Sequence, residues 1–110
     1  KVNYTGLPSH PQHTLASQQM KQHGALLSFE IKGGLPAGKK FINGLQLCVK
    51  AVSFGTLDTL ISHPASMSHF GLTQAERDLF HITPGLLRVS VGLEDIEDIL
   101  TDFEQAFAQV

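Results

Sequence analysis

The chain has 110 residues, with eight lysines and arginines against ten aspartates and glutamates, so its formal net charge at pH 7 is −2. No basic run and no mixing of basic with aromatic side chains is present, so a nucleic-acid partner is not expected. No apolar run approaches the roughly 18 residues of a membrane span, and the single cysteine, Cys48, cannot form an internal disulfide. These features predict a protein of the reducing cytoplasm that binds neither nucleic acid nor a membrane.

The length of the chain is that of a single domain. The sequence opens on Lys1-Val-Asn-Tyr, with neither an initiating methionine nor a leader segment. We therefore expect residues 1–110 to be one domain of a longer polypeptide.

The first third of the chain is predicted to form a strand, a helix and a second strand. Val2–Tyr4 is a short strand candidate. A helix is expected to start at Pro11, since proline is tolerated at the first helical position, and to continue to Met20. Residues 25–32 alternate apolar and polar side chains, which is typical of a half-buried strand.

The middle of the chain is predicted to contain a helix, two strands and a loop. Apolar side chains recur at helical spacing from Pro36 to Leu45, which predicts a second helix. Residues 47–54 could be the tail of this helix or a strand, and their composition favours a strand; residues 57–61 are a further strand candidate. Residues 63–69 are expected to form a polar loop without a core face.

The last third is predicted to form a short helix, a strand and a long helix. Thr73 and Glu76 have the spacing of a capping box, which predicts a helix through Leu79. Residues 86–91 alternate in the period of a strand, and residues 96–107 have the apolar stripe of an amphipathic helix.

Helices that interrupt half-polar strands are typical of an α+β fold. Such strands suit an antiparallel or mixed sheet with one face covered by helices. We therefore expect a two-layer sandwich with a mainly antiparallel sheet and helices on one face.

Arg88 is the most conspicuous charged residue, because it lies in the middle of the last predicted strand among branched apolar side chains. Its guanidinium does not lose its proton, so it must reach water or pair with an anion. The pattern alone favours a structural ion pair or an exposed position over a ligand-binding role.

Serines and histidines gather in one loop, at Ser62, His63, Ser66, Ser68 and His69. Nucleophilic chemistry would require a base oriented by a third group, and the spacing supplies none, so hydrogen bonding within the loop is the default expectation. No cysteine pair accompanies the histidines and no glycine-rich phosphate-binding motif is present, so neither a metal site nor a nucleotide site is expected.

Several spaced motifs occur together in one order. They are Gly6-Leu-Pro-Ser-His-Pro-Gln-His, Ser53-Phe-Gly, Thr59-Leu-Ile-Ser-His-Pro-Ala-Ser-Met-Ser-His and Gly85-Leu-Leu-Arg-Val-Ser-Val-Gly-Leu-Glu-Asp. In this order they closely resemble the C-terminal domain of the Cys/Met-metabolism family of pyridoxal-phosphate-dependent enzymes, and the match extends over essentially the whole chain.

The resemblance implies the small C-terminal domain of an aspartate-aminotransferase-like fold. In this family a larger N-terminal domain binds pyridoxal 5'-phosphate and supplies the Schiff-base lysine, and the usual assembly is a homotetramer. None of the six lysines here matches the cofactor-lysine motif, namely Lys1, Lys21, Lys32, Lys39, Lys40 and Lys50. The resemblance thus implies no catalytic, cofactor-binding or metal-binding residue in this chain.

The resemblance also implies a set of substrate-binding residues. Arg88 corresponds to the family arginine that forms a bidentate pair with the substrate α-carboxylate, for which a planar guanidinium fork is suited. Ser53 matches a serine that faces the same carboxylate, and Ser68 matches a hydroxyl position, usually threonine, beside the substrate.

Val52 carries the implied choice of sulfur-containing substrate. Family members that act on methionine carry an apolar residue at this position, whereas those that act on cystathionine tend to carry glutamate. An apolar wall suits a methylthio group, so the resemblance favours γ-elimination of methionine. Elimination or synthesis of cystathionine, O-acetylhomoserine sulfhydrylation, and a fragment without catalytic activity remain the alternatives.

Overall fold

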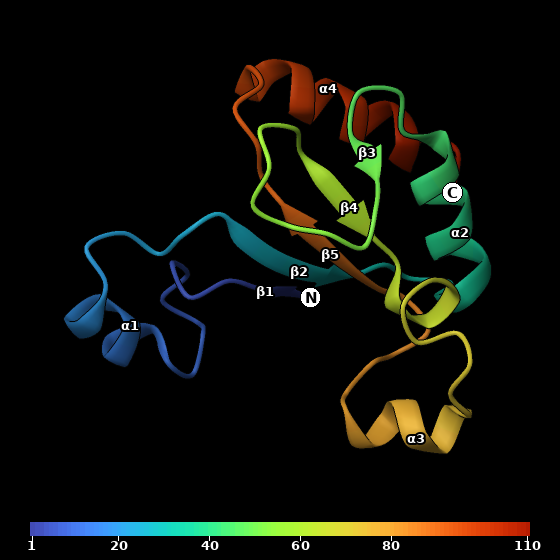
Figure 1. The fold of residues 1–110 in the computed structure, drawn as a ribbon, viewed down its shortest axis with the longest axis horizontal. Helices are drawn as coiled ribbons and strands as arrows, with labels where there is room; N and C mark the ends of the chain where they lie inside the picture. The colour runs from blue at the N-terminus through green and yellow to red at the C-terminus, as the bar shows by residue number, and fades with distance from the viewer.

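A five-stranded sheet forms the centre of the computed structural model, which describes residues 1–110 (Figure 1). In order across the sheet, the strands are β1 (Val2–Asn3), β2 (Leu26–Glu30), β5 (Leu86–Ser90), β4 (Leu60–Ser62) and β3 (Val49–Lys50). All neighbouring strands are antiparallel except β3 and β4, which are parallel. The predicted α+β class with a mainly antiparallel sheet is therefore confirmed.

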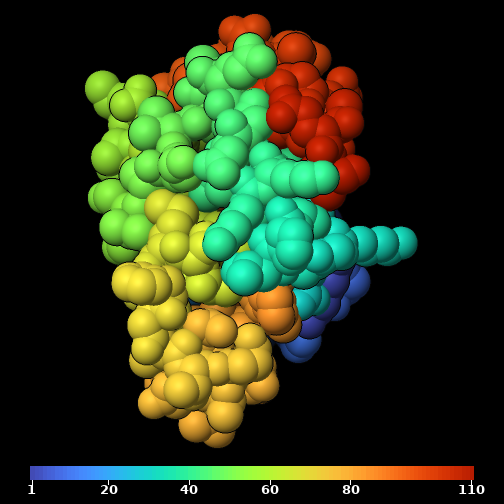
Figure 2. Space-filling view, turned by 90° about the vertical axis from the view of Figure 1, so that its right-hand side faces the viewer, coloured from blue at the N-terminus to red at the C-terminus, as the bar shows by residue number.

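Two of the four α-helices build the second layer. Helices α2 (Gly34–Gly44) and α4 (Ile96–Phe107) pack against each other and against one face of the sheet. The short helices α1 (His13–Gln19) and α3 (Gln74–Leu79) lie beside the sheet rather than on it (Figure 1). Figure 2 shows α2 next to α4, while the segment around α3 projects as a separate lobe. None of the helices combines the length and the apolar composition of a membrane-spanning segment.

Aromatic side chains fill the space between the two layers. Phe41 of α2 is fully buried, and its ring meets Phe29 of β2 and Phe103 of α4 edge to face at 5.7 and 5.6 Å between centroids. The ring centroid of Phe107 lies 4.5 Å from the ring centroid of Phe41. Offset and edge-to-face pairs of this kind add to the free energy of burial, so this cluster fixes how α2 and α4 sit on the sheet.

Both of the first two helices begin at a different residue from the one predicted. Helix α1 starts at His13 rather than Pro11, because His10 and His13 close successive turns through their backbone N–H groups. Helix α2 starts at Gly34, two residues before Pro36, because Gly33 adopts a φ of 91° and turns the chain directly from the strand into the helix.

The segment between α2 and β4 differs most from the prediction. The strand expected over residues 47–54 is only two residues long, and β4 begins at Leu60 rather than Leu57. The backbone N–H groups of Leu47 and Cys48 donate to the Asp102 carboxylate of α4 instead of to a strand. Beyond Ala51 the chain leaves the sheet until β4.

The predicted polar loop over residues 63–69 is wrong in one respect, because its first part is buried. His63 is fully buried at the start of a short 3₁₀ turn (Pro64–Ser66). Its Nε2 donates to the carbonyl of Pro84 at 2.9 Å, and its Nδ1 accepts from Ser66 Oγ at 2.7 Å. Hydrogen bonding, the expected role of this loop, is confirmed, and it ties the loop to the segment that leads into β5.

His63 also accounts for a glycine in α2. A Cβ atom at Gly38 would lie 2.5 Å from His63 Nε2, which is already held by Pro84. We expect Gly38→Ala to lower the free energy of unfolding by about 1–3 kcal/mol, even though alanine is the better helix former. Urea unfolding measures this change.

Gly44→Ala is the matched control in the same helix. Its Cβ atom would meet only the amide end of Gln109, a flexible side chain that can move away. We expect this variant to be neutral or more stable by up to about 1 kcal/mol. Equal destabilisation by the two substitutions would contradict the proposed close packing of His63 on α2.

Candidate functional site

Arg88 lies on the face of the sheet that the helices leave uncovered. Its neighbours in β5, Leu87 and Val89, point into the core, so the alternation of the strand places Arg88 on the opposite side. In register it is flanked by Ser28 of β2 and Ser62 of β4. The predicted period of β5 is thus confirmed, and Arg88 is half-buried on the open face.

A loop over residues 51–58, here called the cover loop, folds onto this face. Arg88 Nη2 donates to the backbone carbonyls of Val52 and Ser53 at 2.7 and 2.9 Å. The Arg88 Cζ atom also lies 5.6 Å from the centroid of the Phe54 ring, within reach of a cation–π interaction. The cover loop therefore fixes the plane of the guanidinium.

The remaining donors of Arg88 are not used by the protein. Both recorded hydrogen bonds go to backbone carbonyls, so no side chain of this chain neutralises its charge. Its Nε atom is buried without a hydrogen-bond partner. A buried donor on a permanent cation is costly unless an acceptor approaches it, so the arrangement suits an external anion such as a carboxylate. The sequence pattern alone favoured a structural ion pair or an exposed position, and the structure shows a half-buried Arg88 bound to two carbonyls instead.

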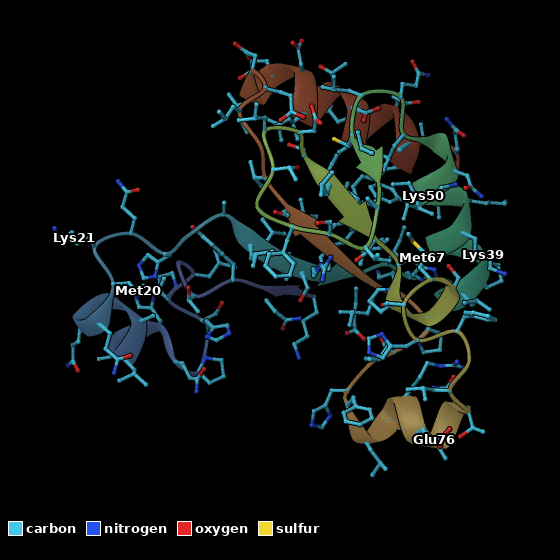
Figure 3. The ribbon with its side chains drawn as sticks, viewed as in Figure 1. Met20, Lys21, Lys39, Lys50, Met67 and Glu76 are labelled. Carbon is cyan, nitrogen blue, oxygen red and sulfur yellow. The ribbon has the colours of Figure 1, made fainter.

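Three of the four predicted site residues meet at this point. Val52 and Ser53 contact Arg88 through their carbonyl groups, while their side chains are exposed. Ser68 is not joined to them by any hydrogen bond, and its Oγ pairs with His69 Nδ1 at 2.8 Å. Figure 3 shows Met67, the residue before Ser68, beside α2.

Hydrogen bonds from β5 and the turn after it connect to the cover loop and were not predicted from the sequence. Ser90 Oγ accepts from the backbone N–H of Gly55 at 3.0 Å. Glu94 accepts from the N–H of Thr59, which holds the pKa of the Glu94 carboxyl below its usual value. The Gly-Leu-Glu run after β5 gave no periodicity signal that would have assigned Glu94 such a partner.

Comparison with solved structures defines the class of fold. The chain superposes on cystathionine gamma synthase from Xanthomonas oryzae pv. oryzae with a TM-score of 0.90 and 42% identity, covering 99% of this chain and 28% of that one. It superposes on cystathionine gamma lyase (CalE6) from Micromonospora echinospora with a TM-score of 0.91 and 37% identity. That match covers 98% of this chain and 28% of that one.

Sequence comparison then identifies the family. The model of the Cys/Met metabolism PLP-dependent enzymes matches residues 1–108, so the chain belongs to this family. It is 53% identical over 110 residues to L-methionine gamma-lyase from Fusobacterium nucleatum subsp. polymorphum, covering 100% of this chain and 28% of that protein. Residues 1–110 thus span little more than a quarter of the length of such relatives.

Residues 1–110 do not by themselves fit pyridoxal phosphate, the cofactor of this family. An amine that forms a Schiff base needs a sheltered site that tunes its reactivity. All six lysines of the chain are exposed, so none lies in such a sheltered site. His, Cys, Asp and Glu side chains form no group of three that could hold a metal ion.

Proposed function

We propose that residues 1–110 are the substrate-carboxylate-binding domain of a pyridoxal-phosphate-dependent methionine γ-lyase. The enzyme would convert L-methionine and water to methanethiol, 2-oxobutanoate and ammonia by α,γ-elimination. The observation that carries the proposal is the Arg88 guanidinium, which is oriented by two carbonyls and paired with no carboxylate of its own chain.

Arg88 would bind the α-carboxylate of the amino-acid substrate. The carbonyls of Val52 and Ser53 already occupy Nη2, so a substrate oxygen would approach the donors of Nη1, which no hydrogen bond within the chain uses. Charge-assisted hydrogen bonds of this kind fix the direction of the carboxylate as well as adding affinity. The substrate amino acid would then be held in a single orientation.

Ser53 and Ser68 would supply hydroxyl groups near the same substrate. The carbonyl of Ser53 holds Arg88, and its side chain is exposed beside the guanidinium, where it can donate to a carboxylate oxygen. Ser68 Oγ has only His69 as a partner, so it can turn toward a ligand. The Ser53 hydroxyl is proposed as a secondary contact to the carboxylate, and the Ser68 hydroxyl as a group that lies beside the substrate.

Val52 would form the apolar wall beside the methylthio group. Its side chain is 55% exposed although its carbonyl is fixed by Arg88, so the apolar surface is presented next to the carboxylate site. An apolar contact of this size discriminates modestly between substrates. The 53% identity to L-methionine gamma-lyase from Fusobacterium nucleatum, against 46% to cystathionine beta-lyase from Coxiella burnetii, supports methionine.

The rest of the site is proposed to lie outside residues 1–110. A larger N-terminal domain of the full-length protein would bind pyridoxal phosphate and provide its lysine, and the domain alone would be inactive. The full-length enzyme is proposed to be a cytoplasmic homotetramer. The chain matches only 28% of the length of its relatives, which supports a site whose other residues come from a different part of the full-length protein.

The alternative is another activity of the same family. Cystathionine γ-lyase, cystathionine γ-synthase and O-acetylhomoserine sulfhydrylase would use the same carboxylate site with a different side-chain pocket. The close superposition on a cystathionine gamma synthase keeps this alternative open.

Substrate profiling of the full-length protein tests the proposal. The purified protein should absorb in the near-ultraviolet to visible range through its bound cofactor, and should release 2-oxobutanoate and methanethiol from L-methionine. A preference for L-cystathionine or O-acetyl-L-homoserine would favour the alternative. Absence of cofactor absorbance and of turnover with all three compounds would refute the assignment as an enzyme, and residues 1–110 expressed alone serve as the inactive control.

A further inference from the structure

We infer that Ser90 and Glu94 are positioning residues for Arg88, acting through the cover loop. The inference rests on the proposed carboxylate-binding role of Arg88 and adds the residues that set its geometry. Ser90 lies in β5, two residues after Arg88 and on the same face, and Glu94 lies in the turn that follows. One strand with its following turn would thus carry both the guanidinium and the anchors of the loop that orients it.

The cover loop has no core packing of its own. Every residue from Val52 to Asp58 is exposed, so burial of apolar surface does not hold its conformation. Phe54 is 61% exposed even though its ring lies over the Arg88 guanidinium. The position of the Val52 and Ser53 carbonyls must therefore come from hydrogen bonds that connect the loop to the sheet.

Ser90 provides the first anchor. It is only 3% exposed, and its Oγ accepts the N–H of Gly55 at 3.0 Å. Gly55 has a φ of 73°, a conformation that glycine adopts without steric cost, so the chain turns sharply at the anchored residue. This turn is two residues beyond the Ser53 carbonyl that receives Arg88 Nη2.

Glu94 provides the second anchor at the other end of the loop. Its two carboxylate oxygens accept from the N–H and the Oγ1 of Thr59 at 2.6 and 2.7 Å. Thr59 is fully buried, and its Oγ1 accepts in turn from the N–H of Gly92 at 2.9 Å. Leu93 N–H donates to the Leu57 carbonyl at 2.8 Å, so the end of the loop is bound to the turn after β5 at several points.

Loss of either anchor should weaken carboxylate binding without removing any group that touches the substrate. The loop would then sample several positions, and Arg88 would lose the two fixed acceptors that set its plane. Carboxylate binding would then have to fix the loop and the guanidinium in one conformation, and this loss of conformational entropy lowers the affinity. A ligand that lacks the carboxylate would lose only its apolar contact with Val52, so its affinity should fall much less.

The test compares two ligands on the full-length enzyme. Affinities for L-methionine and for its decarboxylated analogue, 3-(methylsulfanyl)propylamine, are measured for wild type, Ser90→Ala, Ser90→Thr and the remote control Ser17→Ala. Ser17→Ala also removes a hydrogen bond between a side chain and the backbone, because Ser17 Oγ donates to the His13 carbonyl in α1. We expect Ser90→Ala to raise the dissociation constant and KM for methionine roughly ten-fold, with a smaller change in kcat. The amine, whose methylthio group meets only Val52 of the cover loop, should lose much less affinity than methionine. Ser90→Thr, which keeps the hydroxyl, should restore most of the methionine affinity.

Arg88→Ala separates this inference from the proposed function. If Arg88→Ala leaves methionine affinity unchanged, the carboxylate role itself fails. If Arg88→Ala weakens methionine alone but Ser90→Ala does not, or Ser90→Ala weakens both ligands equally, only the positioning role is refuted. In the Arg88→Ala background, Ser90→Ala should have a much smaller effect on methionine than in wild type, because the guanidinium is already absent and only the contacts of Ser53 and Val52 remain to be lost.

Glu94→Gln keeps the inference testable if Ser90→Ala fails to fold. The amide retains the shape of the side chain but can no longer accept from both Thr59 groups. The same selective loss of methionine affinity supports the inference, and an unchanged ratio of the two affinities refutes it.

Discussion

Replacement of Arg88 by alanine in the full-length enzyme is expected to reduce kcat/KM for L-methionine by about 2–5 kcal/mol, or roughly 30- to 5,000-fold. The carboxylate would lose the cation proposed to bind it, and the two carbonyls of the cover loop would lose their shared donor. Most of the effect should appear as a higher KM. Steady-state kinetics with methionine, set beside binding of the decarboxylated amine, measure the loss.

Two further variants make this expectation specific. Arg88→Lys keeps the charge but loses the planar fork, so we expect it to recover only a small part of the activity. Lys50→Ala also removes one positive charge, but Lys50 is exposed and its Nζ contacts only Asn43. It should leave kcat/KM unchanged. An Arg88→Ala enzyme with wild-type kcat/KM would disprove the proposed role.

Local signals in the sequence were sufficient where an element is held by its own residues. The alternation of residues 86–91 predicted a strand, and in β5 Leu87 and Val89 are buried in the core while Arg88 lies on the opposite face. The capping box of Thr73 and Glu76 is also present, with reciprocal hydrogen bonds at the start of α3. Both patterns depend on neighbours a few residues away along the chain, which a sequence displays directly.

The predictions failed where a distant residue determines the backbone. Residues 47–54 have the composition of a strand, but the Asp102 carboxylate, more than fifty positions later, takes the N–H groups at the start of that segment. Likewise, the sequence predicted His63 in a polar loop. In the structure His63 is buried, because Pro84 and Ser66 provide hydrogen-bond partners for both of its ring nitrogens. Local composition contains no information about such partners.

The candidate site was predictable in its chemistry but not in its construction. Arg88 stands out because a permanent cation in an apolar strand needs a partner. Nothing in the sequence indicates that the partners inside the chain are the carbonyls of Val52 and Ser53, since every residue carries a carbonyl. The family resemblance implied that Val52 and Ser53 contact the substrate. The structure shows in addition that their carbonyls hold the Arg88 guanidinium.

Asp102 is the buried residue that the sequence analysis missed. It lies within the amphipathic helix α4, is 4% exposed, and accepts from the backbone N–H groups of Gln46, Leu47 and Cys48 at 2.7, 3.1 and 2.8 Å. Burial alone would raise the pKa of the Asp102 carboxyl, but the N–H donors of Cys48, Gln46 and Leu47, with the Gln105 amide, hold the pKa below its usual value. Burial, followed by the adjacent Asp102, raises the pKa of the Cys48 thiol to about 12, so this thiol stays protonated beside the carboxylate.

We expect Asp102→Asn to lower the free energy of unfolding by about 2–4 kcal/mol. Each carboxylate oxygen accepts at least two hydrogen bonds, so the amide nitrogen of asparagine would face donors in either orientation. Urea unfolding of the full-length protein measures the loss, and hydrogen exchange of residues 46–48 localises it. Glu104→Gln removes a charge from the exposed side of the same helix and should change stability by less than about 0.5 kcal/mol.

The Asp102 carboxylate should also make stability depend on pH in a defined direction. Its pKa is lower in the folded than in the unfolded protein, so the unfolded chain binds more protons at pH values between the two. The stabilisation is therefore complete above the unfolded pKa, near 4, and is lost as the pH falls through the folded pKa. The carboxyl of Glu94, whose pKa is also lowered, adds to the loss in the same direction. The free energy of unfolding should fall less steeply with decreasing pH in Asp102→Asn than in wild type. An equal fall in the two proteins would show that the ionised Asp102 carboxylate does not stabilise the fold through the backbone N–H donors.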